Sequence, residues 1–269
     1  MVIKVIIIKK ELKFNLKNFI IWVIVVVLFV FMYASVTKFF TDQNSPAIKF
    51  IEKFPENLLK TFNIDLEAFS KTEGIFGTEG MLFMFLIFAI YAIVLSSKIF
   101  AGEFDNKTVE YLFIKPINRK RIFCEKLFAI WLYLITFFSF FLLSELMFFN
   151  MYLDDFRTKV LFGFAAYVFV ISILFSSISI FFSILFQKRK FVNSLSIALL
   201  FLFYFFNSVT QGVDTFEFLR KISVFHYLSS VDLVNTGKIN YLSMFVILFV
   251  SLTLLYFSKK RFENQDILI

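Results

Sequence analysis

The chain has 269 residues, of which 59% are hydrophobic and only 18% are charged, and its net charge is +8. Soluble domains carry roughly 25% charged residues, so this composition excludes an ordinary soluble protein. Cys124 and His226 are the single cysteine and the single histidine, which excludes an intramolecular disulfide and a metal site built from several histidines. Cations beside a membrane explain the positive charge better than nucleic-acid binding does, so we expect no nucleic-acid partner.

Six windows of 18 to 28 residues, from Asn18–Thr37 to Ile239–Ser258, contain no charged side chain. About 20 apolar residues in a helix cross a hydrocarbon core ~30 Å thick. Because backbone polar groups in lipid must pair within their own segment, each window is expected to be helical. We therefore predict an all-α, polytopic integral membrane protein that forms a single transmembrane domain over residues 1–269. The six predicted spans cover residues 19–40, 81–99, 127–149, 160–186, 191–211 and 240–258.

Residues 3–17 predict an N-terminal interfacial helix ahead of the first span. At 100° per residue, one face collects the apolar side chains of Val5, Ile8, Leu12, Leu16 and Phe19. Lys10, Lys13 and Lys17 fall on the opposite face, where they can reach lipid phosphates. The alternative interpretation is a merely basic leader before the span.

Two of the remaining segments are expected on the far side of the membrane from the termini. The polar stretch Thr41–Glu79 is expected to hold one or two amphipathic helices. The stretch Asp214–Lys238 is short and apolar, with Phe218, Leu219, Ile222 and Phe225 at helical spacing. We expect it to form a re-entrant or interfacial helix in the outer leaflet.

The distribution of lysine and arginine predicts the orientation. The N-terminal segment, the loop 100–126, the turn 188–190 and the tail 259–261 together hold 17 of these residues. Nine lysines and arginines lie in the three loops on the other side, which are Thr41–Glu79, the loop between spans three and four, and Asp214–Lys238. The positive-inside rule then places both termini in the cytoplasm. We expect the protein in the cell membrane of a bacterium or an archaeon.

The chain has no phosphate-binding glycine loop, nucleophile elbow, C-x-x-C or H-E-x-x-H sequence, so we predict no catalytic, cofactor-binding or metal-binding residues. Glu145 is an acid near the outer end of the third span and is a candidate for the translocation path, although an acid near the interface is also explained by solvation. Four serines of the fourth span share one face, which favours close helix packing over a polar path. They are Ser172, Ser176, Ser179 and Ser183.

The most informative segment is Gly102–Ala129, with the sequence GEFDNKTVEYLFIKPINRKRIFCEKLFA. Residues 103–112 predict a short amphipathic helix, which Pro116 ends because its ring clashes with the preceding turn. The basic run 119–121 and Lys126 then lead into the third span. A helix, a proline and a basic run on the inner face are typical of a docking element, although a solvated basic loop has the same composition.

This segment resembles the signature of the type 2 ATP-binding-cassette exporter permeases. In that family, a Glu at the inner end of span two leads through a Thr and a hydrophobic pair to Pro-x-Ser-Arg and then to a Lys that opens span three. The corresponding residues here are Glu103, Thr108, Leu112, Pro116, Arg119 and Lys126. The chain departs from the pattern at Lys107 and Glu125, where Gly is common, and at Asn118, where Ser is common.

The resemblance implies a permease subunit that binds no cofactor itself. A separate ATPase subunit would bind ATP and Mg, a second permease subunit would complete the path, and membrane lipid would surround both. The six residues of the signature would form the ATPase-coupling loop. The rival hypotheses are a non-transporting scaffold or immunity component with the same fold and, less favoured, a stand-alone ion-driven carrier, because the spans offer few charges and few helix breaks.

Overall fold

The computed structural model describes residues 6–41, 66–69, 71–106, 108, 117–153, 155–209 and 217–264. These residues form helices and no strand, which confirms the all-α prediction. Six helices are long and apolar enough to cross a membrane, as the charge-free windows predict. They are α1 (Ile6–Thr41), α5 (Met81–Ile99) with the preceding π-helix η2 (Phe76–Gly80), α8 (Arg119–Tyr152), α9 (Thr158–Phe186), α10 (Arg189–Val209) and α14 (Tyr241–Asn264).

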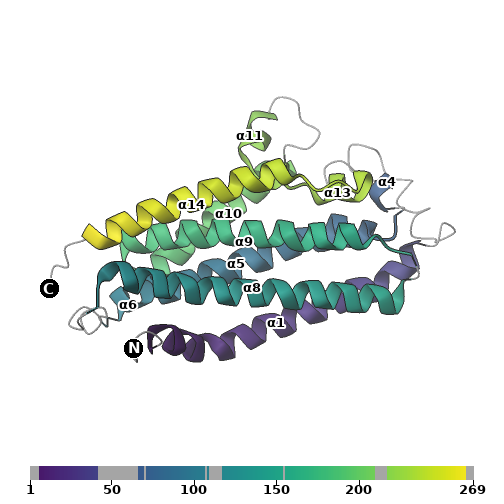
Figure 1. Ribbon diagram of the computed structural model, residues 1–269. Coiled ribbons are helices and arrows are strands. Elements are labelled where there is room, and N and C mark those ends of the chain that lie inside the picture. The colour runs from purple at the N-terminus through teal and green to yellow at the C-terminus, as the bar shows by residue number, and fades with distance from the viewer. Residues whose placement is uncertain are drawn as a thin grey trace.

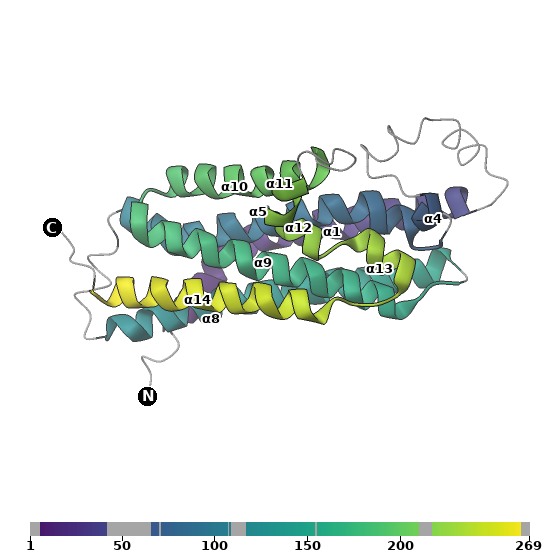
Figure 2. The same ribbon diagram turned by 90° about the horizontal axis from the view of Figure 1, so that it is seen from above.

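The long helices lie side by side in an elongated bundle (Figures 1 and 2). The start of α1 and the end of α14 lie at one end of this bundle, together with the start of α8 (Figure 1). We call this end the terminal end and the other the opposite end. Helix α9 occupies the centre and packs against α5, α8, α10 and α14. This position explains why α9 is the most buried of the long helices.

Several of these helices run beyond the charge-free windows that predicted them. Helix α8 has 34 residues and is therefore about 51 Å long, well over the ~30 Å hydrocarbon core. Its first turn carries the basic residues 119–121, which do not interrupt a helix. Helices α8 and α1 therefore extend past the lipid at the terminal end, where they bring charged side chains together.

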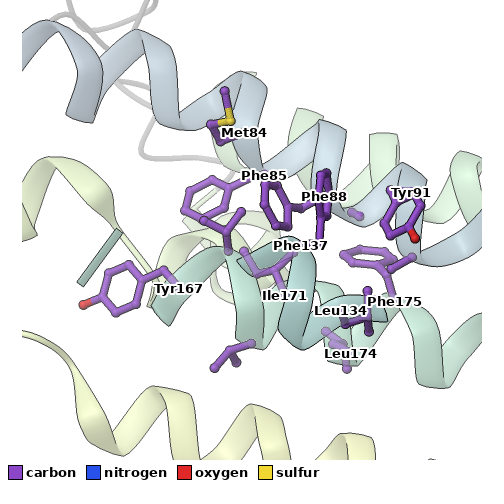
Figure 3. Packing of buried hydrophobic residues seen from close by; sticks show 14 of the residues in the cluster. Met84, Phe85, Phe88, Tyr91, Leu134, Phe137, Tyr167, Ile171, Leu174 and Phe175 are labelled. Atoms are coloured by element: carbon purple, nitrogen blue, oxygen red, sulfur yellow. The ribbon is translucent and has the colours of Figure 1, made fainter. Parts of the chain in front are cut away.

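Aromatic side chains fill the middle of the bundle (Figure 3). The Phe88 and Phe137 rings stack with their centroids 4.1 Å apart, and Tyr91 lies 4.7 Å from Phe137. These contacts join α5 to α8, and Phe19 of α1 adds its ring 5.0 Å from that of Tyr133. Offset and tilted rings of this kind contribute more than their buried area alone. Part of the phenylalanine content is thus used for contacts between helices.

The outward faces of α1, α10 and α14 remain apolar and exposed. In each of these three helices only 22% of the most apolar window is buried. Leu28, Leu202 and Phe249 are 60%, 43% and 64% exposed, respectively. An exposed apolar surface of this size suits lipid rather than water.

The predicted N-terminal helix is present from Ile6, but it is continuous with the first span. Its face toward the bundle also differs from the predicted apolar face. The buried side chains are Ile7, Glu11, Asn15 and Phe19, whereas Leu16 is 50% exposed. Phe14 and Leu16 therefore face outward, whereas the polar Glu11 and Asn15 share the buried face with Ile7 and Phe19.

The helix predicted within Asp214–Lys238 is divided into three short helices, and its placement in the outer leaflet stays a prediction. The structure divides this region into α11 (Glu217–Ile222), α12 (Val224–Tyr227) and α13 (Ser230–Thr236). Ser223 breaks the helix, because its hydroxyl accepts from the Phe225 backbone N–H and donates to the Phe203 carbonyl of α10 at 2.7 Å. Phe225 consequently turns into the core, while Phe218 is 71% exposed.

Candidate functional site at the terminal end

The candidate site is built on a sharp turn at the end of α5. After Ile99 the chain continues as the short helix α6 (Ala101–Asp105), which places Glu103 against α8. The Glu103 carboxylate forms an ion pair with Lys126, whose side chain is only 2% exposed. The Lys126 ammonium also donates to the Ile99 carbonyl at 2.6 Å. A buried ammonium requires such partners, because its desolvation costs several kcal/mol.

The Glu103–Lys126 pair closes the base of the segment that joins α6 to α8. On the first side of this segment, the backbone N–H of Thr108 donates to the Glu103 carbonyl at 2.9 Å. On the second side, Asn118 caps α8 by accepting from the Lys120 backbone N–H at 3.0 Å. Arg119 donates to the Glu263 carbonyl of α14 at 3.4 Å. Both ends of the segment are thus attached to the bundle.

Helix α1 adds a second cation and a second acid to this site. The Lys10 ammonium lies 3.4 Å from the Glu103 carboxylate, and its side chain is 46% exposed. Glu11 is buried one residue further on, where the Asn15 side-chain amide donates to its backbone carbonyl at 2.8 Å and to its carboxylate at 3.4 Å. The Tyr133 hydroxyl of α8 donates to the Leu12 carbonyl. These bonds attach the start of α1 to α6 and α8.

An aromatic cluster connects the end of α14 to the same site. The Phe100, Phe123 and Phe262 rings lie with their centroids 5.2 to 6.2 Å apart. All three side chains are nearly fully buried. The Lys126 ammonium lies 5.4 Å from the Phe100 ring centroid, which is within the range of a cation–π contact. The terminal ends of α1, α6, α8 and α14 therefore pack together around one buried cation.

Of the six residues predicted for the coupling loop, the structure joins Glu103 to Lys126 and Thr108, whereas Arg119 bonds to α14. Glu103, Arg119 and Lys126 lie at the base of this loop, and the exposed Thr108 begins it. The other two, Leu112 and Pro116, lie outside the residues that the structure describes. The predicted helix over 103–112 is helical at residues 103–105, but α6 ends at Asp105 and Asn106 has left the helical conformation. Residues 109–112 lie outside the described part of the chain.

Glu103 is oriented inward, and sequence reasoning missed its partners on α1. The prediction for residues 3–17 directs Lys10 to lipid phosphates and gives no role to Glu11 or Asn15. The available signal was the i, i+4 spacing of Glu11 and Asn15, which puts two hydrogen-bonding side chains on one face. Partners that lie on helices distant in sequence carry no such periodic signal.

The candidate path serines lie between helices, away from this site. The Ser176 hydroxyl of α9 lies 2.7 Å from the Ser96 hydroxyl of α5, and Ser179 donates to the Ile93 carbonyl at 3.0 Å. Ser172 and Ser183 donate to carbonyls of their own helix. Serines in such positions allow two membrane helices to approach closely.

Glu145 lies apart from all of these residues, in an apolar part of the bundle. It is fully buried, and neither carboxylate oxygen has a hydrogen-bond partner within the part of the chain that the structure describes. Phe141 and Phe149, one turn before and after it, lie with their ring centroids 6.3 and 5.5 Å from that of Phe76. An isolated carboxylate in such surroundings is costly for the fold.

The opposite end of the bundle carries its own buried acid. Glu73 is 1% exposed, and its carboxylate accepts from the Arg157 guanidinium at 3.0 Å. The same guanidinium donates to the Val234 carbonyl at 2.7 Å, and Lys71 donates to the Asn235 carbonyl at 3.1 Å. These bonds hold α13 against the segment that precedes η2.

The fold and these two networks define a multi-pass, all-helical membrane protein whose connecting segment between α6 and α8 is anchored by a buried ion pair. The chain belongs to the family described as ABC-2 family transporter protein, whose model matches residues 5–267. It is therefore a transmembrane component of an ABC transporter, and the family is not itself a nucleotide-binding domain. A search of curated proteins found no match.

Proposed function

We propose that this chain is the permease subunit of an ABC exporter. A separate ATPase subunit binds and hydrolyses ATP with Mg, and two permease subunits, identical or different, form the path for the substrate. The family match over residues 5–267 carries this proposal. The chain's own part is to convert movement of the ATPase into movement of its helices.

The segment between α6 and α8 is the proposed point of contact with the ATPase subunit. Its described ends lie at the terminal end of the bundle, and the Glu103–Lys126 pair ties the two sides together. A push on this segment would pass directly into α5 and α8, because Lys126 also holds the last carbonyl of α5 at Ile99. This connection supports a mechanical role for the segment better than a free surface loop would.

We further propose that the terminal end faces the cytoplasm of a bacterial or archaeal cell. The segments expected at this end hold 17 lysines and arginines against nine in the other loops. Cys124 provides a direct test, because its thiol is exposed near the start of α8. A membrane-impermeant thiol reagent should label Cys124 only after cells are opened, and should label Lys238→Cys in a Cys124→Ser background in intact cells. The reverse pattern would overturn the orientation.

For the translocation path, Glu145 remains the stronger of the two candidates. The serines of α9 already have hydrogen-bond partners within the bundle, and a path along them would require α5 and α9 to separate. Glu145 has no such partner, so a change of conformation that brings a polar group to it would be favourable. We propose that Glu145 meets the path in a state other than this one.

Purification of the tagged chain from its native membranes tests the proposed function. An ABC ATPase should co-purify in a stoichiometric amount, and the complex should hydrolyse ATP, whereas the chain alone should bind none. Glu103→Lys places a third cation beside Lys126 and Lys10, so the complex should lose most of its hydrolysis. Lys238→Glu, an exposed change at the opposite end, is the matched control and should leave hydrolysis intact.

The outcomes distinguish the rival functions. A complex without any ABC ATPase would contradict the permease assignment. An ABC ATPase that co-purifies and hydrolyses ATP in vesicles without moving any substrate across them would favour the scaffold or immunity component. If Glu103→Lys assembles and hydrolyses ATP like the parent, the α6–α8 segment is only a solvated basic connector.

A further inference from the structure

A groove of about 750 Å³ runs between α9 and α14 at the terminal end. The two helices lie side by side in both views of the bundle (Figures 1 and 2). The groove is confined to the last turns of each helix and opens on the outer surface. None of the site residues described above lines it. Its lining residues are Phe181, Leu185, Leu254, Phe257, Lys260, Arg261 and Asn264.

The inner part of the groove is apolar on both walls. Phe181 and Leu185 are four residues apart on α9, and Leu254 and Phe257 are three apart on α14, so each pair lies on one helix face. Phe257 is 53% exposed. Within a membrane, such an open apolar groove is filled by hydrocarbon chains rather than by water.

The mouth of the groove is polar and positively charged. Arg261 and Asn264 continue the same stripe of α14 that begins at Leu254 and Phe257, and Lys260 flanks it. Lys260, Arg261 and Asn264 are exposed, and neither cation forms an ion pair with another residue that the structure describes. From Leu254 to Asn264 the stripe covers about 15 Å of helix, from apolar to cationic.

We propose that this groove is a binding site for one anionic glycerophospholipid of the leaflet at the terminal end. The acyl chain lies between α9 and α14, against Phe181, Leu185 and Phe257. The phosphate oxygens accept hydrogen bonds from the Arg261 guanidinium and the Lys260 ammonium at the mouth. Cations are favourable at a helix C-terminus, which explains why Lys260 and Arg261 are charged. A bound lipid explains in addition why these two cations lie next to an apolar groove.

The order of apolar and charged residues matches the order of groups in such a lipid. A protein partner from the cytoplasm would meet the cations first and would leave the apolar walls behind them uncovered. A lipid fills both parts at once, since its chain and its headgroup are joined. The lipid is a resident ligand and does not depend on the proposed transport function.

Native mass spectrometry of the purified full chain tests this site. After delipidation in neutral detergent, the chain is titrated with phosphatidylglycerol or phosphatidylcholine of identical acyl chains. One phosphatidylglycerol should bind per chain. Replacing both cations (Lys260→Gln with Arg261→Gln) should weaken its binding about 30-fold, since each cation near an anionic lipid contributes about 1 kcal/mol. The same double variant should bind phosphatidylcholine nearly as well as the parent does.

The matched control changes two cations at the same end that do not line the groove. Lys188→Gln with Lys190→Gln, just before and within the first turn of α10, should leave the binding of phosphatidylglycerol unchanged. Leu185→Trp, which fills the apolar part, should weaken both lipids. Equal binding of the two lipids by the parent would overturn the site. So would an equal loss of phosphatidylglycerol binding in the control variant and in the variant at Lys260 and Arg261.

Two further arms distinguish other occupants. Inorganic phosphate at the same concentration should not displace phosphatidylglycerol, and displacement would mean that the mouth binds phosphate without a lipid chain. In a Cys124→Ser background, Phe257→Cys in native membranes should not form a disulfide between two chains. Efficient crosslinking there would mean that a second copy covers the groove and would overturn the lipid site.

Discussion

The two ends of the bundle each stabilise a buried glutamate with a basic side chain, but they differ in how exposed that basic side chain is. Each holds a buried glutamate paired with a basic residue far along the chain, Glu103 with Lys126 and Glu73 with Arg157. At the terminal end the cation is only 2% exposed, whereas the Arg157 side chain is 42% exposed. The terminal pair therefore carries far more of the desolvation cost and depends more strongly on both partners.

The elements that these charged side chains connect also differ, and they indicate a different structural role for each end. At the opposite end, Arg157 and Lys71 bond to backbone carbonyls of α13, so they hold a short connecting segment in place. At the terminal end, the charged groups join four helix ends directly, namely those of α1, α6, α8 and, through Arg119, α14. An end in which the helices are tied to one another can transmit a displacement of one to the others.

The largest effect is expected from Lys126→Ala at the terminal end. It leaves the Glu103 carboxylate buried beside only the half-exposed Lys10, and breaking a buried pair in this way costs about 3–5 kcal/mol in the free energy of unfolding. Denaturant unfolding in detergent measures the loss. Lys120→Ala, an exposed change on the first turn of the same helix, should change stability by less than about 0.5 kcal/mol. Equal losses of stability in Lys126→Ala and Lys120→Ala would mean that the Glu103–Lys126 pair does not stabilise the fold.

Arg157→Ala at the opposite end should cost less, about 1–3 kcal/mol. The Arg157 backbone N–H still donates to Glu73, and water reaches the half-exposed site that the guanidinium vacates. ATP hydrolysis by the assembled complex should stay near the parent rate. The exposed neighbour Lys159→Ala is the control for stability. A loss of hydrolysis in a folded Arg157→Ala complex would remove the distinction between the ends.

Glu145→Leu should stabilise the isolated chain, by about 1–3 kcal/mol, because it removes a buried carboxylate that has no hydrogen-bond partner in the described structure. Transport by the complex should fall if Glu145 meets the path, and Glu145→Gln should retain part of it. Thermal unfolding and transport are measured on the same preparations. A destabilised Glu145→Leu chain would show that the carboxylate is satisfied in the fold.

Ser176→Ala should have the smallest effect, about 0.6 kcal/mol, the average measured for hydrogen bonds between membrane helices. Its hydroxyl lies 2.7 Å from that of Ser96, so Ser96→Ala should have a similar effect and the double variant should cost little more. Ser139→Ala on α8 is the control, because that hydroxyl donates only to its own helix. A complete loss of transport in stable Ser176→Ala would favour a polar path along this face.

The helices could be predicted from the sequence because a long charge-free stretch has one stable arrangement in lipid. The buried face of the start of α1 could not, since the apolar face predicted from periodicity includes Leu16, which is 50% exposed, and omits Glu11 and Asn15, which are buried. The break at Ser223 also involves the Phe203 carbonyl, twenty residues away, and that contact has no local sequence pattern. The motif resemblance selected Glu103 and Lys126 as members of one loop. That they bond to each other follows only from the packing of α6 on α8.

The most direct test of the central claim is a double-mutant cycle on ATP hydrolysis by the assembled transporter. The variants are Glu103→Gln, Lys126→Met and the two combined, so that each single change leaves one buried charge without its partner. If the pair ties the coupling segment to the bundle, each single change lowers the rate and the double variant is no slower than the slower single one. Two losses that multiply in the double variant, or two fully active single variants, would contradict the account.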